Sequence, residues 1–258
     1  MLDLLSLSAV GLVVLATLLC GQVDKLEPER RNFWTSAAGG TSAAFIFVVL
    51  FPKLVAAQAA LTSGVDHGFF AYLNYHSSLI ALVGLLTFWA FERKVVVLVA
   101  RLATSLEESP GGSHSRSNTP VWSSLLYTQA LMFSAYAGLV GYLIAETTGG
   151  DMRVLALYAL AMALHFLGLG LSLRYQIGEA YDHLERWLLA AALLFGWLLA
   201  QLTELSYVRV ALLNSLFAGM LIYIVIKNEV PSPSEGRFKP LLYGAVGYSI
   251  LVEVTTSL

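Results

Sequence analysis

Charged residues are scarce in this sequence, and cysteine is almost absent. Only 12% of its 258 residues are Asp, Glu, Lys or Arg, about half the share usual in soluble domains, and 57% are hydrophobic. The single cysteine, Cys20, excludes an internal disulfide and a cysteine-based zinc site. A net charge of −2, with no basic cluster among aromatic residues, excludes nucleic acid as a partner. We therefore expect the lipid bilayer to be the main solvent and partner of this chain.

Long apolar runs fill the sequence, and polar stretches divide them into eight segments. Each has about the 20 apolar residues that a helix needs to cross the hydrocarbon core. Backbone groups in hydrocarbon must be hydrogen-bonded within the segment, which favours helices over strands. The predicted fold class is all-α: a polytopic membrane helix bundle with eight transmembrane helices arranged as three plus five. The spans are predicted near 3–21, 34–60, 72–92, 121–145, 152–174, 185–203, 208–227 and 238–257.

Lys and Arg are distributed unevenly between the two sides of such a bundle. Twelve of the fifteen fall in connections on one side, and only Lys53, Arg153 and Arg209 fall on the other. The positive-inside rule places the basic side in the cytoplasm, so both termini of this multi-pass protein are predicted on the outer side of the plasma membrane. The first apolar run has no Lys or Arg before it and is expected to be a retained helix rather than a signal peptide.

A polar stretch at 104–120 divides the predicted helices into two groups within one membrane domain, 1–258. It is rich in Ser, Gly and Pro and cannot bury enough apolar surface to fold by itself. We expect a flexible cytoplasmic loop here, between the first three helices in 1–103 and the last five in 121–258.

Short motifs in the second, third, seventh and eighth predicted helices accompany this helix order. They are Ala37-Ala-Gly-Gly40, Leu50-Phe-Pro-Lys-Leu54, Leu82-Val-Gly-Leu-Leu-Thr-Phe-Trp-Ala-Phe-Glu-Arg93, Phe217-Ala-Gly-Met-Leu-Ile-Tyr223, Glu229-Val-Pro231 and Gly244-x-x-Gly247. Motifs and helix order together resemble the ZIP (zinc/iron permease-like) family of divalent-metal transporters. The resemblance spans almost the whole chain, implies a permease fold, and leaves a homodimer open as the assembly.

The resemblance also implies metal ligands in the fourth and fifth helices, where this sequence departs from the family. The family's fourth helix carries a His-Asn-x-Pro-Glu-Gly type motif, and the counterpart Phe133-Ser-Ala-Tyr-Ala-Gly138 keeps only the glycine. The fifth normally carries His-x-x-Pro-Glu-Gly, and here reads His165-Phe-Leu-Gly-Leu-Gly170. His165 is thus the one metal ligand that the resemblance carries over, whereas zinc usually takes four.

Four polar residues inside predicted membrane helices are candidates for a site. An ionisable side chain there is costly and indicates function, so His165 is the first candidate for a site. The alternative is a neutral imidazole hydrogen-bonded to a neighbouring helix. Gln129, Ser134 and Tyr136 of the fourth helix either line a substrate path with His165 or serve as ordinary hydrogen bonds between helices.

Two polar connections also hold residues of the metal-ligand type. Glu146 and Asp151 flank a predicted outer loop, where they either gather cations at an entrance or belong to a solvated turn. A second group, in the predicted cytoplasmic connection, forms either an exit-side metal site or ion pairs with Arg186. This group consists of Glu179, Asp182, His183 and Glu185.

The expected function is that of a ZIP-like permease, carrying a divalent metal ion or a small solute through the bundle by secondary transport. Zn²⁺ or another divalent metal would be its substrate and not a resident cofactor. The alternative is a membrane scaffold, subunit or sensor that keeps the fold without its metal site. An enzyme is not expected, because an intramembrane hydrolase needs a nucleophile with its base or a metal cluster, and neither Gly-x-Ser-x-Gly nor His-Glu-x-x-His occurs.

Overall fold

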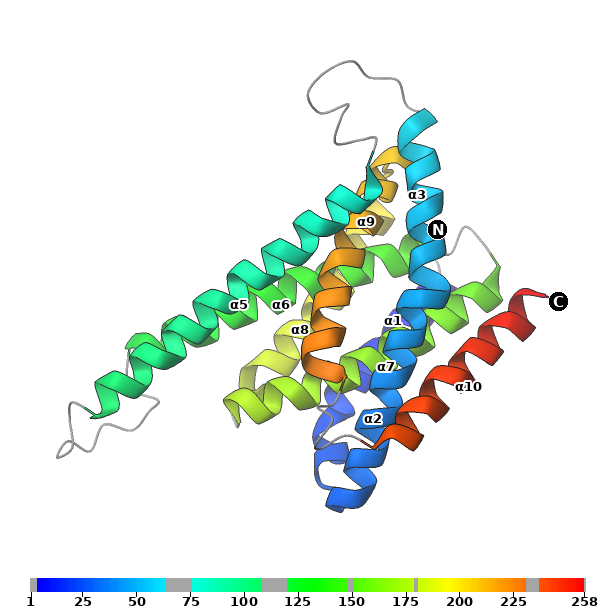
Figure 1. Cartoon of the computed structure of the whole chain (residues 1–258). Helices are drawn as coiled ribbons and strands as arrows, with labels where there is room; N and C mark the ends of the chain where they lie inside the picture. The colour runs from blue at the N-terminus through cyan, green and yellow to red at the C-terminus, as the bar shows by residue number, and fades with distance from the viewer. Residues whose placement is uncertain are drawn as a thin grey trace.

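The computed structural model describes residues 4–63, 76–107, 120–147, 151–178, 181–230 and 237–257, and the regular elements among them are all helical (Figure 1). The all-α class predicted from the sequence is confirmed. In chain order the elements are α1 (Leu4–Asp24), α2 (Pro28–Phe45), η1 (Ile46–Leu50), α3 (Phe51–Ser63), α5 (Ser77–Glu107), α6 (Pro120–Glu146), α7 (Met152–Ile177), η4 (Tyr181–Glu185), α8 (Arg186–Leu202), α9 (Tyr207–Ile224), η5 (Val225–Glu229) and α10 (Phe238–Thr256).

The described residues form eight continuous helical rods, because the π-helical segments η1, η4 and η5 adjoin α-helices. Five rods contain stretches that are long and apolar enough to cross a membrane, which is the mark of an integral membrane protein. The apolar helix of α8 is shorter. The five stretches are Leu4–Val23, Pro28–Ala59, Leu126–Glu146, Met152–Gln176 and Tyr207–Glu229. The count of eight spans and the side of each terminus remain predictions.

The helix of the third predicted span continues beyond the predicted end of that span. The span was expected to finish at residue 92, but α5 continues to Glu107. Charged side chains do not end a helix, and neither Pro nor Gly occurs between Gly84 and Pro110. Residues 104–107 of the predicted loop are therefore helical, and at its other end Pro120 already begins α6. The rest of that loop, 108–119, lies outside the described residues.

Two rods contain a π-helical segment at matching positions. η1 follows α2 and η5 follows α9, and after each segment an N–H donates to the carbonyl five residues earlier. In the sequence a proline stands two residues beyond each segment, at Pro52 and Pro231. A proline lacks an N–H and clashes with the carbonyl four residues before it, which favours a wider turn at that point.

The same two rods cross their neighbours through matched glycines. A Cβ atom at Gly40 of α2 would collide with the Leu241 carbonyl oxygen of α10, and Gly244 of α10 allows the same approach in the other direction. Between α9 and α5, Gly219 and Gly84 form an equivalent pair. In both rods the glycine stands six residues before the π-helical segment. The crossing of α2 with α10 and that of α9 with α5 are therefore two copies of one structural repeat.

Helix packing extends this pairing over the whole bundle. The most extensive contacts join α1 to α7, α2 to α10, α5 to α9, and α6 to α8, and α2 lies along α10 in Figure 1. The largest fully buried side chains are aromatic and come from four rods. They are Tyr136, Tyr158, Phe45, Phe166 and Phe217. The core is thus built where α2, α6, α7 and α9 converge.

Candidate functional site

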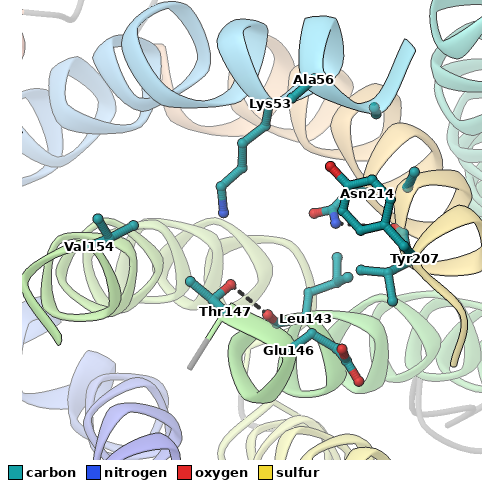
Figure 2. A pocket seen from close by; sticks show the side chains of 11 residues that line it. Lys53, Ala56, Leu143, Glu146, Thr147, Val154, Tyr207 and Asn214 are labelled. Atoms are coloured by element: carbon teal, nitrogen blue, oxygen red, sulfur yellow. Dashed lines mark hydrogen bonds between the residues drawn. The ribbon is translucent and has the colours of Figure 1, made fainter. Parts of the chain in front are cut away.

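A cavity of about 250 Å³ lies between α3, α6, α7 and α9, at the end of the bundle where α6 finishes and α7 begins (Figure 2). Its polar lining consists of Lys53, Glu146, Thr147, Tyr207 and Asn214. The predicted entrance residue Glu146 is therefore on this cavity. Its predicted companion Asp151 has another task, because its carboxylate caps α7 by accepting a hydrogen bond of 3.0 Å from the Arg153 N–H.

Buried aromatic rings close the bundle beyond this cavity. The Lys53 ammonium lies 4.3 Å from the centroid of the Tyr158 ring. The Tyr136 ring of α6 is stacked between Phe166 of α7 and Phe217 of α9, with centroid separations of 6.0 and 5.9 Å. The rings next to Lys53 and around Tyr136 are all buried.

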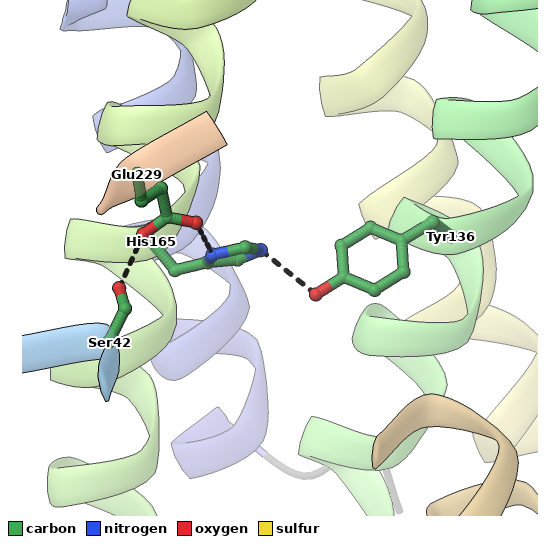
Figure 3. A network of polar contacts seen from close by, with 4 residues as sticks. All are labelled: Ser42, Tyr136, His165 and Glu229. Atoms are coloured by element: carbon green, nitrogen blue, oxygen red, sulfur yellow. Dashed lines mark hydrogen bonds and ion pairs between the residues drawn. The ribbon is translucent and has the colours of Figure 1, made fainter. Parts of the chain in front are cut away.

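Four helical rods meet deeper in the bundle at a network of polar side chains (Figure 3). The Tyr136 hydroxyl is 2.9 Å from Nε2 of His165, and the Ser42 hydroxyl donates a 2.5 Å hydrogen bond to Oε2 of Glu229. The other carboxylate oxygen of Glu229 contacts Nδ1 of His165. None of the four residues is more than 6% exposed. The network joins α2, α6, α7 and η5 inside an apolar core.

The donor and acceptor roles in this network depend on the tautomer of His165. With Glu229 ionised, Nδ1 of His165 carries the proton and donates it to the carboxylate. Nε2 of the neutral ring then accepts from the Tyr136 hydroxyl. A second proton on His165 would turn Nε2 into a donor and reverse that hydrogen bond. The direction of the hydrogen bond between Tyr136 and His165 therefore depends on the proton at Nε2.

The structure separates the four polar residues singled out from the sequence. Tyr136 and His165 are in direct contact. Gln129 stands two turns before Tyr136, and both of its amide atoms are buried with no hydrogen-bond partner in the part of the chain that the structure describes. The Ser134 hydroxyl is likewise buried, and no described residue bonds it. Gln129 and Ser134 do not join the network at His165.

Sequence analysis missed Ser42 and Glu229. The seventh predicted helix ends at residue 227, and Glu229 falls in the polar stretch after it, two residues before Pro231. In the structure η5 extends the rod to Glu229 and leaves its side chain buried. Ser42 is a common small residue in a small-residue motif, so no signal in one sequence marks it. The useful signal at Glu229 is its spacing from Pro231, which matches that of Leu50 from Pro52.

The network offers few ligands to a metal ion. His165 and Glu229 supply one nitrogen and one carboxylate, and no group of three or more His, Cys, Asp or Glu residues occurs among the described residues. A zinc site usually takes four such ligands. His165 as a metal ligand remains a prediction.

Comparisons with known proteins do not assign this chain to a family. No protein-family model and no curated protein matches the sequence. The resemblance to ZIP permeases therefore remains a prediction based on helix order and short motifs.

The connection between α7 and α8 contains ion pairs. Asp182 contacts Arg174 at 3.0 Å and Arg186 at 3.8 Å. The sequence left two alternatives here, an exit-side metal site or ion pairs with Arg186. The contacts of Asp182 are ion pairs. Of the other residues in that group, Glu179 and the side chain of His183 lie outside the described part of the chain.

Glu185 ends this connection, immediately before the apolar segment Arg186–Leu202, and is only 2% exposed. Burial raises the pKa of its carboxyl from 4.5 to about 8. The folded state thus holds this proton more tightly, so the contribution of Glu185 to stability is fully present below pH 4.5 and is lost as the pH rises to about 8. We expect Glu185→Gln to remove most of this decline, as measured by thermal unfolding in detergent across that range. The exposed Glu204→Gln is the control, and an unchanged decline in Glu185→Gln would contradict the assignment.

Proposed function

We propose that this protein is a ZIP-like permease of the plasma membrane, with eight spans and both termini outside, that carries a small solute by secondary transport. The network of Ser42, Glu229, His165 and Tyr136 is the observation that supports this most. An ionisable pair inside a membrane bundle is costly, and such groups in transporters line substrate paths and proton relays. A divalent metal is the less favoured substrate because the described residues offer so few ligands.

The internal repeat supports the same proposal. Secondary transporters are commonly built from structural repeats whose interrupted helices meet at a site near the middle of the membrane. Here the two rods that carry the π-helical segments η1 and η5 bring Ser42 and Glu229 to the network. A π-helical turn leaves backbone groups in an altered register, which suits a helix that changes shape during a cycle.

The network also suggests the driving ion. Because a proton on His165 reverses its hydrogen bond to Tyr136, protonation changes how α6 is held against α7. A proton gradient would then drive the change between two arrangements of the bundle. We expect solute uptake to depend on the pH gradient across the membrane.

The test is uptake into proteoliposomes with and without an imposed pH gradient. The substrates are Zn²⁺, Mn²⁺, L-alanine and propionate. His165→Ala is expected to reduce uptake to the level of empty vesicles. Tyr136→Phe keeps the ring but loses the hydroxyl, and is expected to shift the pH dependence of uptake. Tyr127→Phe, on an exposed face of α6, is the matched control.

The opposite result is equally informative. If folded, reconstituted protein takes up none of these substrates under any gradient, the proposal fails. The alternative of a scaffold, subunit or sensor with a permease-like fold then becomes the better explanation.

A further inference from the structure

Lys53 places a positive charge at the inner side of the cavity between α3, α6, α7 and α9. Its side chain points into the empty space in Figure 2, and its ammonium lies over the Tyr158 ring at 4.3 Å. Lys53 makes no salt bridge to a described residue. Lys53 is half-buried, and a cation that is partly withdrawn from water favours a negatively charged partner. The cavity leaves room for a ligand that supplies this negative charge.

The cavity wall across from Lys53 offers acceptors. The Asn214 amide donates a 3.1 Å hydrogen bond to a carbonyl of its own helix, and its oxygen faces the cavity in Figure 2. Thr147 donates its hydroxyl proton to another helix carbonyl at 2.8 Å, so only its oxygen lone pairs remain. Glu146 adds a negative charge to this rim, although its carboxylate is turned away from Lys53. This wall suits a ligand group that donates hydrogen bonds.

We propose that the cavity binds a small zwitterion of the amino-acid type, with its carboxylate at Lys53 and its ammonium at the oxygens of Asn214 and Thr147. This deepens the proposed transport function, on which it rests, by naming the class of substrate. A divalent cation is repelled by Lys53, and a plain carboxylate leaves the acceptor wall unmatched. The volume of about 250 Å³ suits a molecule of a few heavy atoms.

The place of the cavity connects it to the buried network. Val154 of α7 lines the cavity, and His165 follows it by three helical turns on the same helix, about 16 Å along the axis. A zwitterion in the cavity therefore lies about three helical turns of α7 from the buried network.

Equilibrium binding of isotope-labelled L-alanine to the full chain in detergent tests this inference. Competition by propionate and by propylamine separates the two ends of the zwitterion, and Zn²⁺ serves as the cation probe. We expect alanine to bind more tightly than any of the three competitors. Lys53→Met should weaken alanine binding by about tenfold or more, because a charge-assisted hydrogen bond is lost. Arg209→Met removes an exposed positive charge at the same end of the bundle and should leave binding unchanged.

Asn214→Leu provides a second test that keeps the lysine. It should reduce the affinity for alanine toward that for propionate, because one of the two contacts to the ammonium is removed while the lysine stays. Equal binding of alanine and propionate to the unaltered protein, or full alanine binding by folded Lys53→Met, would overturn the inference.

Binding and transport can fail separately. Alanine binding that depends on Lys53, with no uptake into vesicles, supports the zwitterion site and counts against the permease. Solute uptake that Lys53→Met leaves unchanged supports the permease and overturns the zwitterion site.

Discussion

Leucine in place of Glu229 is expected to lower the free energy of unfolding by about 3–5 kcal/mol, and leucine at His165 in the same chain is expected to recover much of that loss. Removing the carboxylate leaves Nδ1 of His165 and the hydroxyl of Ser42 buried without their present partner. Removing the imidazole as well replaces the pair by apolar groups that suit the surrounding core. The double variant should therefore be more stable than Glu229→Leu alone.

A double-mutant cycle measures this coupling. Unfolding of the unaltered protein, both single variants and the double variant is followed in one detergent, and the interaction free energy is taken from the four values. The ion pair of Lys227 with Glu92 is the matched control, because Lys227 is 37% and Glu92 15% exposed. Breaking that pair with Glu92→Gln should change stability by less than about 1 kcal/mol. Additive effects of Glu229→Leu and His165→Leu would contradict a coupled pair.

The same residues show how far one sequence leads toward the site. His165 can be found because an ionisable residue interrupts an otherwise apolar run, and that signal is local. Glu229 stands two residues before a proline at a helix end, where a charged residue is ordinary. Its burial depends on η5 extending the rod and on the packing of η5 against α2 and α7. No pattern in the sequence gives the register of a π-helical turn.

Helix existence was more predictable than helix ends or helix neighbours. Apolar runs of membrane length locate the rods, because hydrocarbon favours helices that satisfy their own backbone groups. The continuation of α5 past residue 92 does not follow from charge, because a helix continues into water unless a breaker stops it. The pairing of α2 with α10 joins segments about 200 residues apart, and glycines mark only where such contacts are sterically allowed.

Alanine in place of Gly219 is expected to destabilise the protein by about 3 kcal/mol or more, the upper part of the range for overpacked sites. The added Cβ would collide with the Ala81 carbonyl oxygen of α5. Backbone atoms cannot rotate away as a side chain does, so α9 and α5 must separate along their whole contact. The cost should exceed the gain in helix propensity of about 1 kcal/mol that alanine brings.

Gly247→Ala is the control for this prediction, because no atom lies within 4 Å of the position a Cβ would take there. Thermal unfolding in detergent should show Gly247→Ala unchanged or slightly stabilised and Gly219→Ala strongly destabilised. The internal repeat makes the test stricter, since Gly40 is the counterpart of Gly219 and meets the Leu241 carbonyl in the same way. Gly40→Ala should therefore cost about as much as Gly219→Ala. A large loss of stability at one glycine and none at the other would mean that the two crossings contribute unequally to the stability of the fold.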